Sequence, residues 1–78
     1  MKVKAISKTN CFKCEWSKEQ LRYYPIEWLN FDTDEEAREL ARKYNLTTTP
    51  AFLVFHDDGN VTTTRSVLVV KKLVDRNI

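Results

Sequence analysis

The sequence predicts a small α/β protein whose elements follow the order β-α-β-α-β-β-α. Two observations support this prediction: strand-like and helical periodicities alternate through the first half of the chain, and a glycine turn joins two strand-like runs in the second half. The first two strands, joined through a helix, should be parallel, and the last two should form an antiparallel hairpin. The chain has 78 residues, so we expect one domain spanning 1–78 with one compact core.

The first half of the chain provides a strand, a helix and a second strand. Residues 2–6 form a short apolar strand-like segment, and residues 26–31 form another that alternates over part of its length. Between them, apolar and small residues recur at spacings of three and four, which predicts a helix that begins near Cys11 and is ended by Pro25. The inward stripe of this helix consists of Cys14, Ser17, Leu21 and Tyr24. Trp16 and Trp28 are expected to be core residues.

The next helix has start and stop signals in the sequence. Thr33 and Glu36 have the spacing of a capping box, with Thr33 as the N-cap. Asn45 suits a left-handed stop at the other end. The face between these signals is apolar at helical spacing and consists of Ala37, Leu40, Ala41 and Tyr44.

The second half predicts a hairpin followed by a helix. Residues 51–55 are continuously apolar, as expected for a central strand covered on both faces. Gly59, in a turn over 57–60, would return the chain into a partner strand over 61–65. Residues 67–70 are also good strand material, but apolar residues at helical spacing favour a helix beginning near Ser66. Its apolar face consists of Val67, Val70, Leu73 and Val74.

Composition excludes several classes of function. Apolar residues make up 42% and charged residues 31% of the chain, as in ordinary soluble domains. The net charge of +2 is too small for a nucleic-acid-binding stripe, so we expect no nucleic-acid partner. No apolar run approaches the ~20 residues that cross a bilayer, and no apolar segment of a secretory signal follows the first lysines. We therefore expect a cytoplasmic monomer with no membrane partner.

The two cysteines of the chain, Cys11 and Cys14, lie three apart at the predicted start of the first helix. Exposed N–H groups at a helix N-terminus favour a thiolate, and Lys13 and Lys8 add positive charge nearby. A thiol one turn further on can resolve a mixed disulfide formed by the first one. The spacing therefore favours a dithiol–disulfide site in which Cys11 is the nucleophile and the more buried Cys14 is the resolving thiol.

Two other interpretations of the pair were weighed. A structural disulfide across so short a loop gains little chain entropy. A zinc site normally takes four ligands, and only His56 could join the pair, with Asp57 or a second chain completing the set. We therefore expect no bound metal and no bound organic cofactor.

The segment 7–14 resembles the active-site segment of glutaredoxins, in which a lysine at the position of Lys8 helps to hold a partner's carboxylate. Segments 29–32 and 46–55 are more similar to thioredoxins, including the Thr49–Pro50 entry into a strand. Nearly the whole chain thus resembles the thioredoxin-fold family, as a small redoxin of mixed type. This resemblance implies a central four-stranded mixed sheet flanked by three helices.

The resemblance also implies a site. In the family the proline matching Pro50 is cis and lies against the dithiol, which leaves the backbone of Thr49 free to pair with an extended substrate. Residues of substrate binding would be Lys8, Phe12, Lys13, Thr49 and Pro50. A basic rim of Lys8, Lys13, Lys18 and Arg65 would prefer acidic tails, although a scatter of solvated lysines explains the same residues.

Two positions depart from the family pattern. The buried acid of thioredoxins is Ala5 here, so deprotonation of Cys14 would use water or another group. The Gly-Gly and acidic residue that grip glutathione in glutaredoxins are replaced by residues 64–67, which include no glycine.

The function implied is reduction of protein disulfides, with an external flavoprotein reductase or glutathione renewing the dithiol. Small redoxins that serve ribonucleotide reductase show the same mixture, and bacteriophages often encode such short versions. A glutathione-dependent glutaredoxin and a non-catalytic adaptor are the alternatives.

Overall fold

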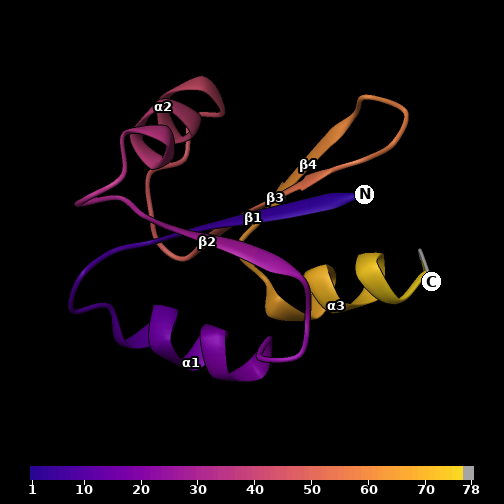
Figure 1. The fold of residues 1–78 in the computed structure, drawn as a ribbon, viewed down its shortest axis with the longest axis horizontal. Helices are drawn as coiled ribbons and strands as arrows, with labels where there is room; N and C mark the ends of the chain where they lie inside the picture. The colour runs from indigo at the N-terminus through magenta and orange to yellow at the C-terminus, as the bar shows by residue number, and fades with distance from the viewer. Residues whose placement is uncertain (77–78) are drawn as a thin grey trace.

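The computed structural model describes residues 1–76, and these form the predicted order of strands and helices (Figure 1). The elements are β1 (Lys2–Ser7), α1 (Phe12–Gln20), β2 (Ile26–Asn30), α2 (Glu35–Lys43), β3 (Ala51–Phe55), β4 (Val61–Thr64) and α3 (Val67–Arg76). The fold class predicted from the sequence is confirmed.

The strands form a mixed sheet in the order β2-β1-β3-β4. β1 and β2 are parallel, because α1 carries the chain back across the sheet between them. β3 is antiparallel to β1, and β4 returns beside β3 as the partner of the predicted hairpin. The two central strands, β1 and β3, are the most buried, since both of their faces are covered.

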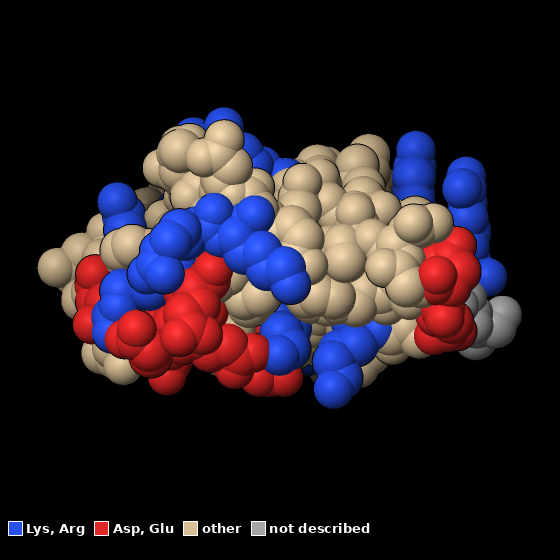
Figure 2. All heavy atoms as spheres, turned by 90° about the horizontal axis from the view of Figure 1, so that it is seen from above, with Lys and Arg blue, Asp and Glu red and all other residues tan. Residues whose placement is uncertain are grey.

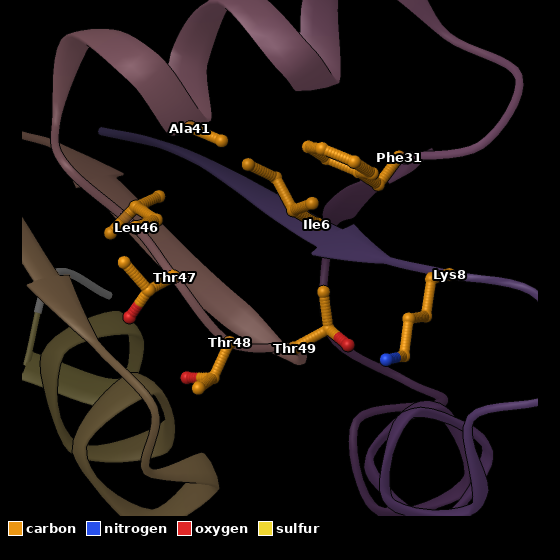
Figure 3. A pocket seen from close by; sticks show the side chains of 8 residues that line it. All are labelled: Ile6, Lys8, Phe31, Ala41, Leu46, Thr47, Thr48 and Thr49. Atoms are coloured by element: carbon orange, nitrogen blue, oxygen red, sulfur yellow. The ribbon is translucent and has the colours of Figure 1, made fainter.

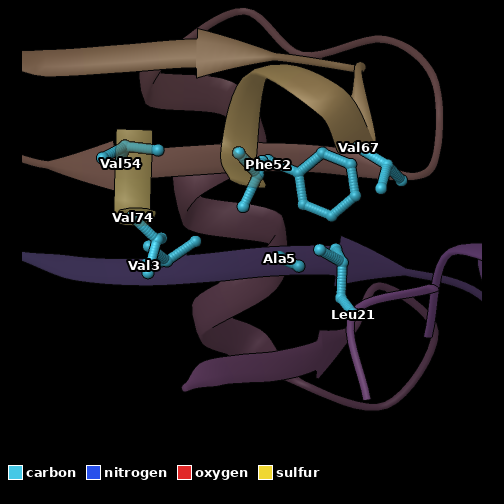
Figure 4. Packing of buried hydrophobic residues seen from close by; sticks show 8 residues of the cluster. Val3, Ala5, Leu21, Phe52, Val54, Val67 and Val74 are labelled. Atoms are coloured by element: carbon cyan, nitrogen blue, oxygen red, sulfur yellow. The ribbon is translucent and has the colours of Figure 1, made fainter. Parts of the chain in front are cut away.

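Helices cover the sheet on both sides, with α1 and α3 on one face and α2 on the other (Figure 1). Alternate residues of the central strands therefore enter two separate clusters. On the α1–α3 face, Val3 and Ala5 of β1 meet Phe52 and Val54 of β3 (Figure 4). The cluster beneath α2 contains Ile6, Leu29, Ala37, Ala41, Ala51 and Leu53.

α1 is shorter than the sequence predicted. It ends at Gln20, four residues before the predicted stop, and the chain then passes through turns to Pro25. The residue before a proline avoids helical backbone angles, so the chain leaves the helix before it reaches Pro25. The inward stripe is nevertheless correct, since Leu21 is buried and Tyr24 is partly buried at the same face.

The predicted capping box of α2 is wrong by one residue. Asp34, and not Thr33, is the N-cap, and its side chain makes no cap hydrogen bond to the helix. The Asp34 carboxylate accepts instead from the backbone N–H of Asn30 at 2.8 Å, which closes the turn between β2 and α2. Asn45 adopts a φ of 57° after α2, as the predicted left-handed stop requires.

The C-terminal half follows the prediction closely. Gly59 has a φ of 91° in the β3–β4 turn. α3 begins at Val67, and the Ser66 hydroxyl accepts from the N–H of Val69 at 3.3 Å.

The two tryptophans, both predicted to be core residues, differ in burial. Trp28 packs edge-on against Phe52, with ring centroids 5.8 Å apart, as expected for a core residue. The prediction for Trp16 is wrong, because 54% of it is exposed. It lies at the surface between α1 and the start of α3 and belongs to neither core cluster.

Candidate active site

Cys11 and Cys14 form a disulfide at the start of α1, with their Cα atoms 5.2 Å apart. Cys11 is the N-cap of the helix and has extended backbone angles, so its sulfur points back over the first turn. Cys14 lies within that turn on the inward side and is 1% exposed, whereas Cys11 is 8% exposed. Cys11 is thus the more accessible of the two sulfurs, as expected for the attacking one.

The polar surroundings of Cys11 suit a sulfur that carries negative charge. Its Sγ accepts a hydrogen bond from the backbone N–H of Cys14 at 3.2 Å, in the way that serine or aspartate caps a helix. The Thr49 hydroxyl lies 3.7 Å from the same Sγ. Both groups, together with the helix N-terminus, would stabilise a Cys11 thiolate once the disulfide is reduced.

The loop before β3 brings the second part of the site against the disulfide. The Thr49–Pro50 peptide bond is cis, as the family resemblance predicted. Pro50 is buried, and Thr49 is partly exposed beside Cys11. The predicted juxtaposition of this loop and the dithiol is therefore present in the structure.

Lys8 lies on one side of this loop. It lines a hollow of about 170 Å³ together with Thr49, below Phe31 and Ile6 (Figure 3). In Figure 3, Lys8 from the end of β1 and Thr49 from the loop before β3 lie on the same side of the hollow. A cation and a hydroxyl thus line one hollow, and the hydroxyl is the one that lies beside Cys11.

Lys13 lies on the other side of the loop, where it lines a second and larger hollow with Pro50. Phe12, between Cys11 and Lys13 in the sequence, is 86% exposed and projects from the first turn of α1. Thr49 thus lies against Cys11, while Lys8 and Lys13 line hollows that reach the same loop. That these residues, with Phe12 and Pro50, bind substrate stays a prediction.

A residue that the sequence reasoning missed, Asp32, holds the segment before the disulfide. Its carboxylate accepts from the backbone N–H of Thr9 at 2.9 Å. This hydrogen bond is the main reason that the pKa of Asp32 is lowered, and the nearby charges of Lys8 and Arg38 lower it further. An acidic residue two positions after the end of β2 was the available signal, since the ends of two adjacent parallel strands share one edge of the sheet.

Ala5 replaces the buried acid of thioredoxins and is completely buried in β1. Its partners across the sheet are Trp28 on β2 and Phe52 on β3. The side chains on both sides of Ala5 in the sheet are therefore apolar, and Ala5 is buried without a carboxylate at this position.

His56 lies far from the cysteines in the fold. It follows Phe55, which pairs with Lys2 at the start of β1, whereas Cys11 follows the opposite end of that strand. Its ring Nε2 lies 2.7 Å from the Thr62 hydroxyl within the hairpin. Among residues 1–76, no group of three or more His, Cys, Asp or Glu is placed to hold a metal ion.

None of the helices formed by residues 1–76 is long and apolar enough to cross a membrane. No protein-family model matches the chain, and neither does any curated protein.

Solved structures do share its fold. The thioredoxin-like protein BC3987 aligns with a TM-score of 0.72 at 24% identity, over 92% of this chain and 99% of that one. Oxidised mitochondrial thioredoxin 3 from Saccharomyces cerevisiae gives 0.66 at 18% identity, over 95% and 76%. A reduced thioredoxin pre-protein from Schistosoma mansoni gives 0.62 at 24% identity, over 97% and 77%.

The protein is therefore an α/β protein with a disulfide at the N-terminus of its first helix. More specifically, it has the thioredoxin fold, as the resemblance implied, with the Cys11–Cys14 disulfide at the start of α1.

Proposed function

We propose that the protein reduces disulfides of other proteins through Cys11 and Cys14. The observation that carries the proposal is the placement of Cys11, whose sulfur caps α1 and also lies 3.7 Å from the Thr49 hydroxyl. A structural disulfide needs neither feature. A nucleophilic thiolate needs both positive potential and an adjacent surface where a substrate can lie.

The reaction consists of two exchanges. The Cys11 thiolate attacks one sulfur of the substrate disulfide, forms a mixed disulfide and releases the first substrate thiolate. The Cys14 thiolate then attacks the Cys11 sulfur, so that the Cys11–Cys14 bond forms and the second substrate thiolate leaves. Two electrons pass from the dithiol to the substrate, and the proton of Cys14 passes to water or another group, since position 5 is alanine.

The cycle requires an external reductant, which we propose to be a flavoprotein reductase of the thioredoxin system. The substrate would be a disulfide-bearing protein of the cytoplasm, and ribonucleotide reductase is the specific candidate that the family resemblance suggests. No bound metal or organic cofactor takes part in the scheme.

Trapping tests the assignment of roles. With Cys14→Ser, a substrate protein should remain joined to Cys11 as a mixed disulfide that intact mass spectrometry can locate. Cys11→Ser is the matched control and should trap nothing. Adducts formed only through Cys14 would reverse the roles, and the absence of both adducts and turnover in a disulfide-reduction assay would favour the adaptor.

A glutathione-dependent activity is the second candidate, and Lys8 is the observation that favours it. Its side chain lines the hollow that also contains Thr49, where a carboxylate of a small peptide could be held. Recycling of the oxidised protein by glutathione, but not by a thioredoxin reductase, would support this candidate over the first.

A further inference from the structure

A hollow of about 470 Å³ lies beside the disulfide, between α1 and the start of α3. Lys13 and Trp16 line it from α1, Pro50 lines it from the loop that contacts Cys11, and Arg65 and Leu68 line it from the opposite side. A chain segment that enters this hollow thus lies next to the reacting sulfur. The hollow is distinct from the one lined by Lys8.

The apolar part of the hollow is unusually exposed. Trp16 is 54% exposed and Leu68 is 61% exposed, and neither belongs to the two core clusters. Large apolar side chains that face each other across a hollow are typical anchors for a partner's apolar side chain. Trp16 also provides an indole N–H at the rim of such a contact.

The charged side chains that line the hollow are all positive. Lys13 and Arg65 line it, and no Asp or Glu within the described part of the chain does so. Neither cation is engaged in a salt bridge within residues 1–76. The first turn of α3 has no acidic residue either, although a helix N-terminus favours one.

Other charged residues of the molecule are arranged differently. Lys18, the remaining lysine of α1, lies over the ring of Trp28 and not in the hollow. On the side of the sheet covered by α2, acidic and basic side chains are interleaved (Figure 2). What distinguishes the hollow beside the disulfide is that Lys13 and Arg65 line it together with the exposed apolar side chains of Trp16 and Leu68.

We propose that this hollow selects substrates in which an Asp or Glu and a large apolar residue flank the reactive cysteine. The partner's carboxylate would lie between Lys13 and Arg65, and its apolar side chain between Trp16 and Leu68. This inference rests on the proposed function, because it assigns a substrate class to the same disulfide. Opposite charges at the rim accelerate encounter and reject partners of like charge.

Three synthetic peptides test the proposal. Each carries one cysteine in a mixed disulfide with 2-nitro-5-thiobenzoate, flanked by Leu and by Asp, Asn or Lys. The second-order rate of thiobenzoate release by the pre-reduced protein is followed by stopped flow. We expect the Asp peptide to react about tenfold faster than the Lys peptide at low salt, and the ratio to approach one in about 1 M salt, where the Debye length is about 3 Å.

Two variants locate the effect. Arg65→Glu should abolish or invert the preference, whereas Lys72→Glu, the same charge change on exposed α3 surface outside the hollow, should retain it. Trp16→Ala should slow the Leu peptides about fivefold relative to matched peptides with Gly in place of Leu. If Arg65→Glu does not fold, Arg65→Gln replaces it and should weaken the preference for the Asp peptide. The salt series on the unaltered protein then tests the same preference independently.

Equal rates for the three peptides, or a preference that survives Arg65→Glu, would overturn the inference while leaving the proposed function intact. If no peptide reacts faster with the protein than with a free monothiol, the proposed function fails as well.

Discussion

Replacing Ala5 with aspartate tests whether the sheet face beneath α1 and α3 is dry and complete. Ala5 is 0% exposed and lies between Trp28 and Phe52 on the neighbouring strands. Val3 and Leu21 belong to the same cluster. A carboxyl group introduced there would have apolar neighbours on the sheet and no cationic partner among them.

The expected destabilisation has two parts. Burying an unpaired polar group costs about 1–3 kcal/mol by mutational data, and overpacking a filled site costs about 1–3 kcal/mol more. The sum of about 2–6 kcal/mol compares with about 4–12 kcal/mol for the free energy of unfolding of a chain of this size. Ala5→Asp should therefore fold but with much of its stability lost.

The loss should depend on pH in a definite direction. Burial disfavours the charged form, so the folded-state pKa of the introduced carboxyl lies above its unfolded value of about 3.9. Between these two values the folded state holds a proton that the unfolded state has released. The free energy of unfolding therefore falls by about 1.4 kcal/mol for each pH unit in this interval.

Urea denaturation from pH 4 to pH 8 measures the effect, with Ala5→Asn as the control of similar shape and no charge. We expect the two variants to be similarly stable near pH 4 and to diverge as the pH rises, with Ala5→Asp the weaker. If the two curves stay parallel, the introduced carboxyl is solvated or paired, and the description of this face as dry is incorrect.

Three further predictions concern the disulfide and two turns. Reduction of the Cys11–Cys14 disulfide should lower the free energy of unfolding by only about 1–2 kcal/mol, since the closed loop is short and a thiolate cap compensates in part; an unchanged denaturation midpoint would contradict this. Asp32→Asn should lower Tm at neutral pH because the Asp32 carboxylate accepts a hydrogen bond from the N–H of Thr9. Since the pKa of Asp32 is lowered on folding, the difference in Tm from wild type should shrink as the pH falls below about 4. A difference in Tm that does not depend on pH would refute the assignment. Asn45 has a φ of 57°, so Asn45→Val should destabilise by about 1–2 kcal/mol while Asn45→Gly should not, as thermal unfolding of both variants would reveal.

Much of the fold could be predicted because its elements carry strong local signals. The continuous apolar run of β3 indicated a strand covered on both faces, and the structure places helices on both sides of it. Gly59 and Asn45 have the positive φ angles that their residue types suggested. Each of these predictions depended on a few neighbouring residues, whose preferences the rest of the fold did not oppose.

The errors arose where neighbours in space changed the outcome. Thr33 and Glu36 have the spacing of a capping box, but the helix starts one residue later, with Asp34 at the N-cap position and its carboxylate bonded to the N–H of Asn30 instead of to the helix. The prediction for Trp16 assumes that the apolar face it shares with Phe12 is buried, yet both side chains are more than half exposed. A helical periodicity identifies a stripe, but it does not identify every apolar residue outside it as buried.

The position of the Cys11–Cys14 pair at a helix start could be predicted from the sequence, but most of the groups that contact it or its loop could not. Two cysteines at a helix start can be recognised from the sequence, because the chemistry of such a pair depends on a spacing within one helical turn. The roles of Asp32 and Arg65 depend on residues distant in the sequence, since Asp32 accepts from Thr9 and Arg65 lines one hollow with Lys13 only after the sheet has assembled. Ala5 is another position that the sequence alone leaves ambiguous. The sequence shows that the acid of thioredoxins is absent at position 5, but an acidic side chain from elsewhere could replace it. The structure shows apolar neighbours of Ala5 on both adjacent strands. The disulfide at the helix start is thus predictable from a spacing within one turn, whereas the groups around it come together only when the sheet assembles.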